Sequence, residues 1–166
     1  MKVKSIAILI ISLLFTETLS AQEIPIPADI KLENVADFAK YHKEILSCID
    51  WLENNALDHP ARQKVNSFVM LWLEGSPNVS VEIDQYIIEY TKKNPEFLMT
   101  FMGGWTTYCL NNPTDKNPAA KGNLAGIKSI LKVYKLGQGV KKDKNIEKLL
   151  EMDEEELTEW LSEQVD

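Results

Sequence analysis

The sequence has few of the residues on which most enzymes depend. Among its 166 residues are one arginine, Arg62, and two histidines, His42 and His59. Forked recognition of phosphate relies on arginine, and general-base catalysis most often relies on histidine. The chain also lacks the G-x-S-x-G, H-E-x-x-H, P-loop and G-x-G-x-x-G patterns. No catalytic residue, cofactor site or metal site is therefore predicted, and these absences favour a protein without enzymatic activity.

Positive charge is also in short supply. The formal net charge is −7, which disfavours nucleic acid as a partner, because phosphate binding needs a basic surface. The charge is divided unevenly, with net +7 over residues 116–148 and net −8 over residues 149–166. Four lysines of the predicted helix 118–136 fall in one narrow stripe: Lys121, Lys128, Lys132 and Lys135. We expect this stripe to face solvent with the acidic C-terminal helices close by, since self-neutralisation explains the division most simply.

The one long apolar run lies at the N-terminus. Lys2 and Lys4 precede a short apolar stretch from Ile6 to Phe15, and a small-residue site ends at Ala21. This arrangement is typical of a cleaved export signal over residues 1–21, because the run is too short to span a bilayer comfortably. The sequence therefore predicts a periplasmic or extracellular protein that begins near Gln22 and has no stable membrane span after cleavage.

Cysteine is limited to Cys48 and Cys109. An exported chain with two cysteines commonly joins them, and closing a loop of this length stabilises a fold by roughly 4 kcal/mol in the chain-entropy model. Both positions also suit buried thiols that pack as small hydrophobic groups. The sequence leaves both alternatives open.

Apolar residues recur at helical spacing through most of the remaining chain. The pattern predicts an extended lead-in over 22–33, then a single helical domain over 34–166. The predicted elements are a long helix over 34–56, a second helix ending at Gly75, a helix through Tyr86 and Tyr90, helices over 95–111 and 118–136, and short helices from Asn145 and Asp153. We predict an all-α, single-domain bundle of about six or seven helices around a central helix near 95–111, because that helix has little polar surface.

Three local patterns predict how these elements begin or connect. The stretch "SPNVSVEID" alternates like a strand, but no second strand exists to pair with it, so we expect an extended link. Asn94 and Asn117 each precede a proline and are predicted to cap the helices that follow. Asp153 and Glu156 have the spacing of a capping box.

Two adjacent glycines interrupt the predicted central helix. Gly103 and Gly104 together cost roughly 2 kcal/mol relative to alanine. The helix over 118–136 has a matching stripe of small residues that includes Gly122 and Gly126. We predict that the two stripes meet and that these four glycines serve close helix packing rather than a ligand.

Several side chains invite a functional interpretation, each with a plainer alternative. His42 and His59 are expected to be a core-side residue and a loop residue. The pairs Asp50–Glu53 and Glu82–Glu89 share helical faces and would suit acid–base work in a cleft, but surface acids at this spacing are common. Trp72, Trp105 and Trp160 fall on apolar stripes and are expected to pack in the core. Trp51 lies off its stripe, so we expect partial exposure and consider it the candidate contact for a partner.

The stretches "FLMTFMGGWTTYCLNN", "KGNLAGIKSILKVYKLG" and "KKDKNIEKLLEMDEEEL" together resemble small exported helical proteins of Bacteroidota that have no assigned function. The general layout also resembles the periplasmic immunity proteins of type VI secretion systems, which are helical and disulfide-bonded. The first resemblance implies an all-helical, exported protein. The second implies a role as an immunity protein or inhibitor, and neither implies catalytic residues.

Three functions follow as hypotheses. The preferred one is a non-enzymatic interaction module with a protein partner. The alternatives are a small hydrolase that uses paired carboxylates, and a carrier for an apolar small ligand in a cavity lined by aromatic residues.

Overall fold

The computed structural model describes residues 24–164, which form eight helices and no strand, so the all-α prediction is confirmed. The predicted signal segment, residues 1–21, lies outside this range. Residues 24–34 form no helix and lead into the first one. The helices are α1 (Val35–Lys40), α2 (His42–Asn54), α3 (Arg62–Gly75), α4 (Gln85–Thr91), α5 (Phe97–Asn111), α6 (Ala119–Leu136), α7 (Lys144–Leu149) and α8 (Glu154–Gln164).

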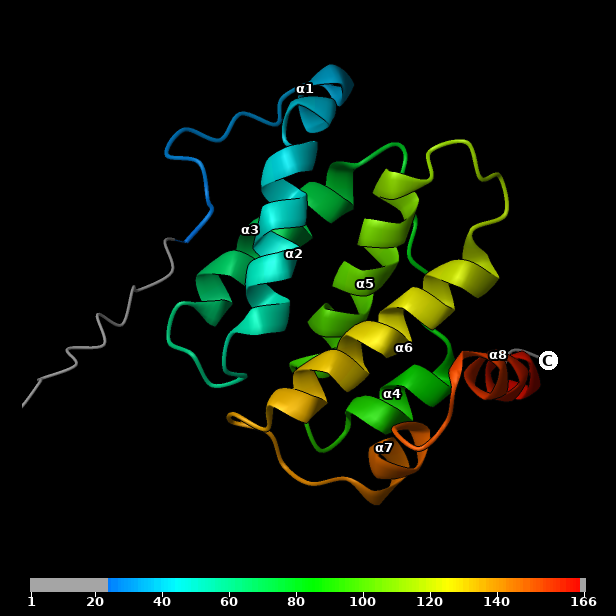
Figure 1. Ribbon diagram of the computed structural model, residues 1–166. Helices are drawn as coiled ribbons and strands as arrows, with labels where there is room; N and C mark the ends of the chain where they lie inside the picture. The colour runs from blue at the N-terminus through cyan, green and yellow to red at the C-terminus, as the bar shows by residue number, and fades with distance from the viewer. Residues whose placement is uncertain (1–23, 165–166) are drawn as a thin grey trace, which may run out of the picture.

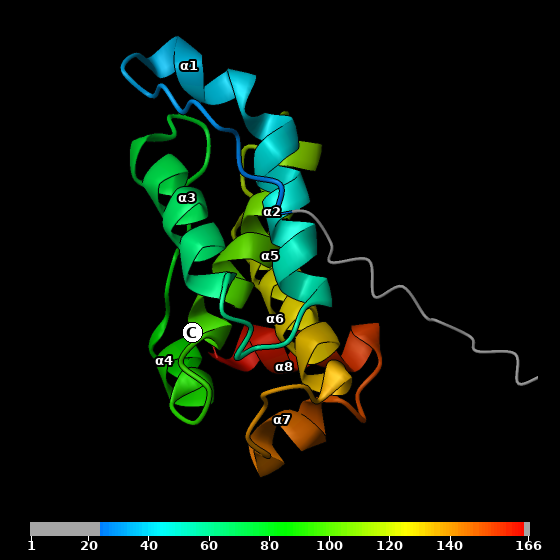
Figure 2. The same ribbon diagram turned by 90° about the vertical axis from the view of Figure 1, so that its left-hand side faces the viewer.

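The helix α5 lies at the centre of the bundle, as its lack of charged residues predicts. It packs on α2, α4 and α6, and its pairing with α6 is the most extensive between any two helices. Figure 1 shows α5 between α2 and α6, and Figure 2 shows α1 and α7 at opposite ends of the molecule. Phe97, Phe101 and Trp105 of α5 are at most 1% exposed. The central helix therefore contributes large side chains to a core that the other helices surround.

Glycines allow α5 and α6 to approach closely. A Cβ atom at Gly104 would lie 2.5 Å from the carbonyl oxygen of Ala125, and one at Gly122 would lie 2.7 Å from the ring of Trp105. Gly126 lies against the ring and the backbone of Phe101. Such separations leave no room for a side chain. The predicted contact between the two stripes is thus present at these three glycines.

Gly103 differs from its neighbour because it faces α2 instead of α6. A Cβ atom there would lie 3.1 Å from Cγ2 of Ile49, which is a tight contact but not an impossible one. Adjacent residues on a helix point about 100° apart, so the two glycines face two different neighbours. The prediction that both glycines face α6 was therefore wrong for Gly103.

The predicted long helix over 34–56 is broken at Tyr41, which accounts for eight helices rather than six or seven. Tyr41 leaves the helical conformation with φ −101° and ψ 7°. Its hydroxyl accepts a hydrogen bond from the Lys31 amide at 2.9 Å, and the buried Trp72 indole donates to the Phe38 carbonyl at 2.9 Å. These bonds hold the lead-in and α1 against α3, so tertiary contacts override the continuous helical pattern.

The single arginine, Arg62, closes the end of α2. It is 2% exposed, and its Nη1 donates to the carbonyl oxygens of Leu52 and Asn55 at 2.8 and 3.2 Å. Its Nη2 donates to the Thr100 hydroxyl of α5 at 3.2 Å. The last carbonyls of a helix have no hydrogen-bond donors within the helix. At the end of α2 the buried guanidinium of Arg62 donates to them. Arg62 thereby joins α2, α3 and α5.

The two asparagines predicted to cap helices do not do so. The side chain of Asn94 instead donates to the Lys141 carbonyl at 2.9 Å and accepts from the Lys141 amide at 2.8 Å. Asn117 precedes α6 without a side-chain cap, and its amide donates to the Asp115 carboxylate at 3.0 Å. The Asn94 side chain pairs with the backbone of a residue far along the chain, and local sequence spacing does not reveal such a tertiary contact.

The C-terminal helix begins and docks as the charges predict. The Asp153 carboxylate accepts from the amides of Glu155 and Glu156 at 2.9 Å, and the Glu156 carboxylate accepts from the Asp153 amide, which completes the capping box. The lysine stripe of α6 faces solvent, and Lys128 pairs with Glu154 of α8 at 2.7 Å. The acidic helix therefore lies beside the basic stripe.

Candidate functional site

Trp51, the residue predicted to contact a partner, is only 1% exposed. Its ring lies edge-on to the His59 ring, with the centroids 4.9 Å apart. The turn after α2 folds back over the tryptophan, so a residue off the main apolar stripe is still covered. The expectation that Trp51 is partly exposed was wrong. Because that expectation was the reason to consider Trp51 a partner contact, Trp51 is not part of the candidate site.

The other tryptophans and the histidines also lie in packing contacts. Trp72 and Trp105 are at most 1% exposed, while the half-buried Trp160 lies between the rings of Tyr86 and Tyr90. The ring of His42 lies edge-on to Trp72 at 5.6 Å. Within residues 24–164 no group of three acidic, histidine or cysteine side chains is placed to hold a metal ion.

The carboxylate pairs do not form an acid–base site. Asp50 is exposed, whereas Glu53 accepts hydrogen bonds from Ser129 and, at 2.8 Å, from Lys132. Glu53 therefore ties α2 to α6. Glu82 lies before the start of α4, so it does not share a helical face with Glu89, and that part of the prediction was wrong.

Cys48 and Cys109 are both buried and are free thiols in this structure. The Cys48 thiol lies on the inner side of the lead-in and donates to the Pro25 carbonyl at 3.4 Å. Cys109 lies on α5 at the edge of a cavity. Of the two alternatives left open by the sequence, the structure has the packed thiols.

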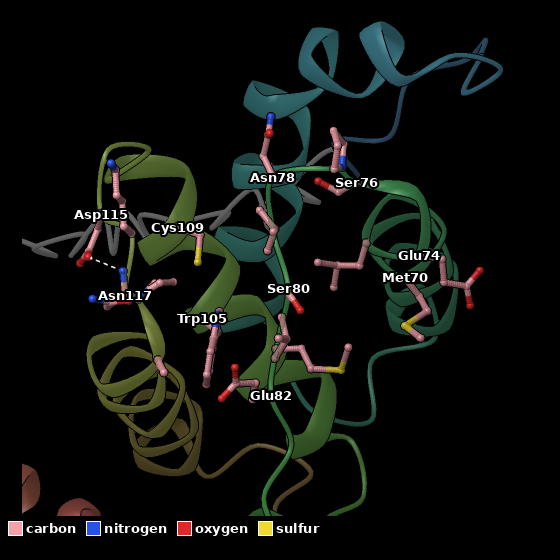
Figure 3. Close-up of a pocket in the computed structure, with 18 residues that line it drawn as sticks. Met70, Glu74, Ser76, Asn78, Ser80, Glu82, Trp105, Cys109, Asp115 and Asn117 are labelled. Atoms are coloured by element: carbon pink, nitrogen blue, oxygen red, sulfur yellow. Dashed lines mark hydrogen bonds between the residues drawn. The ribbon is translucent and has the colours of Figure 1, made fainter.

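This cavity has a volume of about 770 Å³ and is the candidate functional site. It is open to solvent and is bordered by the end of α3, by α5, by the residues between α3 and α4, and by the turn before α6 (Figure 3). Its lining combines apolar and polar groups, which is typical of sites that bind an organic ligand or a peptide. The residues in its walls include Met70, Glu74, Ser76, Met102, Trp105 and Cys109.

The segment between α3 and α4 forms one wall of the cavity. Residues 77–83, which we call the extended segment, adopt no helix, as the sequence predicts for a link. Val79 is 6% exposed and Val81 is half-buried, whereas Asn78, Ser80 and Glu82 are exposed. This alternation is that of a strand with one face on the core. Its valines attach the segment to the bundle without any strand beside it.

Two polar atoms that border the cavity have no hydrogen-bonding partner within the described chain. They are the indole nitrogen of Trp105 and the hydroxyl of Ser76, and both atoms are buried. Burial of an unpaired polar group costs roughly 1–3 kcal/mol, so such groups mark places where water or a ligand supplies the missing bond. Helical spacing predicts Trp105 only as a core residue, because spacing does not show where an indole nitrogen points.

Acidic groups dominate the charge around the cavity. Glu74 and Glu82 are exposed, and Asp115 accepts a hydrogen bond from the Tyr108 hydroxyl at 2.5 Å. That bond, together with the Asn117 amide and Lys121, lowers the pKa of the Asp115 carboxyl. Burial raises the pKa of the Cys109 thiol. The cavity therefore offers carboxylates and a neutral thiol at neutral pH.

A second, more open hollow of about 580 Å³ continues along α3. It shares Met70 and Glu74 with the cavity and adds Leu71, Glu96 and Met99. Met70 and Leu71 are 38% and 51% exposed. Methionine side chains adapt to irregular apolar partners, so the two neighbouring hollows together suit a chain-like ligand.

Among the described residues, no helix combines the length and the apolar character needed to cross a membrane. Comparison of the chain with protein-family models, with curated proteins and with solved structures found no match.

Proposed function

We propose that this protein is an exported interaction module that binds another protein, without catalysis, through the cavity and the adjoining hollow along α3. The observation that supports this proposal is that the two hollows lie next to each other and share Met70 and Glu74 in their walls. A small ligand needs one enclosed site, whereas a protein segment fills an elongated, open surface with an apolar centre and a charged rim.

The chemistry around the cavity favours binding over hydrolysis. A carboxylate that acts as a general acid needs a pKa raised towards neutrality. The carboxyl of Asp115, which borders the cavity, has its pKa lowered by hydrogen bonds instead. The neighbouring Glu74 and Glu82 are exposed, as suits the rim of a protein interface.

Export is part of the same proposal. The N-terminal segment has the composition of a signal peptide, and the resemblance to exported helical proteins of Bacteroidota agrees with it. The resemblance to immunity proteins favours a secreted or periplasmic effector as the partner. Cell fractionation followed by N-terminal sequencing tests this step, and the expected result is a processed chain that begins near Gln22 outside the cytoplasm.

Site-specific photocrosslinking in the native cells tests the binding surface. Benzoylphenylalanine at Leu71 lies on the proposed surface, and the same residue at Leu136 is a matched control. Leu136 is 41% exposed, similar to Leu71, but it lies at the end of α6 and borders neither hollow. We expect one discrete protein adduct at position 71 and none at position 136.

The crosslinked protein, identified by mass spectrometry and purified, is then titrated against the mature chain by calorimetry. Met70→Glu should weaken binding by about tenfold or more, because it buries a charge in the apolar centre of the surface, and Leu136→Glu should leave the affinity unchanged. Equal adducts at both positions, or no adduct at either, would contradict the proposal.

A further inference from the structure

We propose that the extended segment is an edge onto which the partner adds one extended peptide strand, with an apolar side chain of that strand entering the cavity. This inference rests on the proposed function, since it specifies how the protein partner is bound. Main-chain hydrogen bonds along residues 77–83 provide the affinity, and the cavity provides the selectivity.

The backbone of the extended segment has unused hydrogen-bonding groups. Within the described chain, no N–H or C=O group of residues 77–83 makes a hydrogen bond, whereas the flanking Ser76 amide bonds to Leu73 and the Ile87 amide bonds to Asp84. An extended stretch of free amide and carbonyl groups is a template for strand addition. Proteins usually cover or shorten such an edge, so a free edge of this length calls for a partner.

The side chains of the extended segment fix the direction in which its backbone groups point. Val79 and Val81 face the bundle while Asn78, Ser80 and Glu82 face solvent. In an extended chain the N–H and C=O groups point sideways, perpendicular to the side chains, and adjacent residues address opposite edges. Figure 3 shows Ser80 and Glu82 on the segment between α5 and α3. A partner strand that pairs with one edge of the extended segment therefore lies flat on the protein surface beside that segment.

The cavity provides the apolar burial that a pair of strands does not have by itself. Two strands alone are marginally stable in water, so additional burial is needed. Met102, Trp105 and Cys109 offer an apolar lining to a side chain of the added strand, and the unpaired Trp105 indole N–H would donate to a peptide carbonyl or polar group. Trp105 is 1% exposed, so this donor is already desolvated before the partner arrives.

Charge specifies the flanks of the strand. Glu74, Glu82 and Asp115 border the cavity together with Lys116, and Asp115 also pairs with Lys121 at 3.6 Å, so Glu74 and Glu82 supply the negative charge beside the extended segment. The whole chain carries −7. Complementary charge raises association rates and excludes acidic competitors. We therefore infer that the strand carries a large apolar residue flanked by lysine or arginine.

A phage-displayed library of random dodecapeptides, panned on the purified mature chain, tests this inference without knowledge of the partner. The enriched peptides should share an apolar residue with basic neighbours. Amide hydrogen exchange by NMR then reports the binding mode. Upon addition of the best synthetic peptide, exchange should slow by about tenfold or more at alternate residues of 77–83, because only one edge pairs.

Two neighbouring proline substitutions provide a matched pair. Glu82→Pro and Ile83→Pro each remove one amide from an exposed position of the extended segment, and those amides address opposite edges. Only the variant on the paired edge should lose peptide affinity, by about tenfold or more. Circular dichroism and the melting temperature establish that both variants are folded.

The inference is overturned if no peptide is enriched, if the amides of 77–83 gain no protection, or if both folded proline variants bind like wild type. A partner crosslinked at Leu71 that leaves these amides unprotected would overturn strand addition and keep the proposed function. Peptide pairing without any crosslinked partner would uphold the edge and contradict the proposed function.

Discussion

At the scale of single residues, the two adjacent glycines of α5 make different demands on their surroundings. Gly104 faces a backbone carbonyl of α6, which cannot move without moving the helix, while Gly103 faces the side chain of Ile49. The cost of an added methyl group therefore depends on what it meets, and not on the residue type. This contrast gives a test of the packing of α5.

We expect Gly104→Ala to destabilise the protein by about 1–3 kcal/mol, because the methyl group would lie 2.5 Å from the Ala125 oxygen and force the helices apart. Gly103→Ala should change stability by less than about 1 kcal/mol, since the gain in helix propensity offsets the tight contact with Ile49. Urea unfolding measures both variants. Equal effects of the two substitutions would contradict this account of the interface.

The buried arginine gives a second prediction at this scale. Arg62→Met removes the hydrogen bonds that the buried guanidinium donates to the carbonyls of Leu52 and Asn55, so we expect a loss of about 2–4 kcal/mol in unfolding free energy. Thr100→Val removes only one bond to the same guanidinium and should cost about 1 kcal/mol. If Arg62→Met unfolds at the same urea concentration as wild type, the arginine does not stabilise the end of α2.

At the scale of helices, the short α1 depends on one carboxylate. Asp37 accepts hydrogen bonds from the Asn34 and Glu33 amides at 2.9 and 3.2 Å and pairs with Lys40. These contacts, with the Lys40 bond first, lower the pKa of Asp37 from 3.8 to about 2. A lowered pKa in the folded state means that the stabilising contribution is present above pH 3.8 and is lost as the pH falls towards 2.

We therefore expect α1 to fray between pH 4 and pH 2 while the rest of the bundle stays folded. NMR would show this as faster exchange of the Asn34 amide and a shift of its resonance with a midpoint near pH 2. Asp37→Asn should show the frayed α1 at neutral pH and no further acid transition there. An Asn34 amide that titrates near pH 4 in wild type would contradict the assignment.

The helices also show what sequence could and could not predict. The central position of α5 and the capping box of α8 follow from composition and spacing, so both were predictable. The break at Tyr41 was not, because it depends on Trp72 reaching the Phe38 carbonyl from a distant helix. Of the candidate site, the strand-like alternation of the extended segment was visible in the sequence. The cavity was not, because its walls come from α3, α5, the extended segment and the turn before α6, and the unpaired Trp105 nitrogen depends on the same arrangement.

At the scale of the whole molecule, the two thiols report different openings of the fold. Cys48 is 0% exposed beneath the lead-in, and burial raises the pKa of its thiol to about 12. Cys109 is 9% exposed and borders the cavity. Because the folded state holds Cys48 as the neutral thiol, its contribution to stability is present below pH 9 and is lost as the pH rises towards 12.

We expect an aromatic disulfide reagent at pH 8 to modify Cys109 faster than Cys48, with Cys48 reacting only upon global unfolding. The single-thiol variants Cys48→Ala and Cys109→Ala separate the two rates. The unfolded, non-reduced protein should give two thiols per chain. A count of zero would instead show that the cysteines are joined.

The polar turn after α6 has a practical consequence for engineering. Exposed loops rich in glycine and lysine are the usual places to insert an epitope or to create new termini. Here the same loop is tied to two distant parts of the chain, since Gln138 accepts from the Leu57 amide at 2.9 Å and Lys141 is paired twice with Asn94. A tag inserted between Gly137 and Lys142 would therefore detach the end of α2 and the start of α5 together, so this accessible loop is a poor site for a graft.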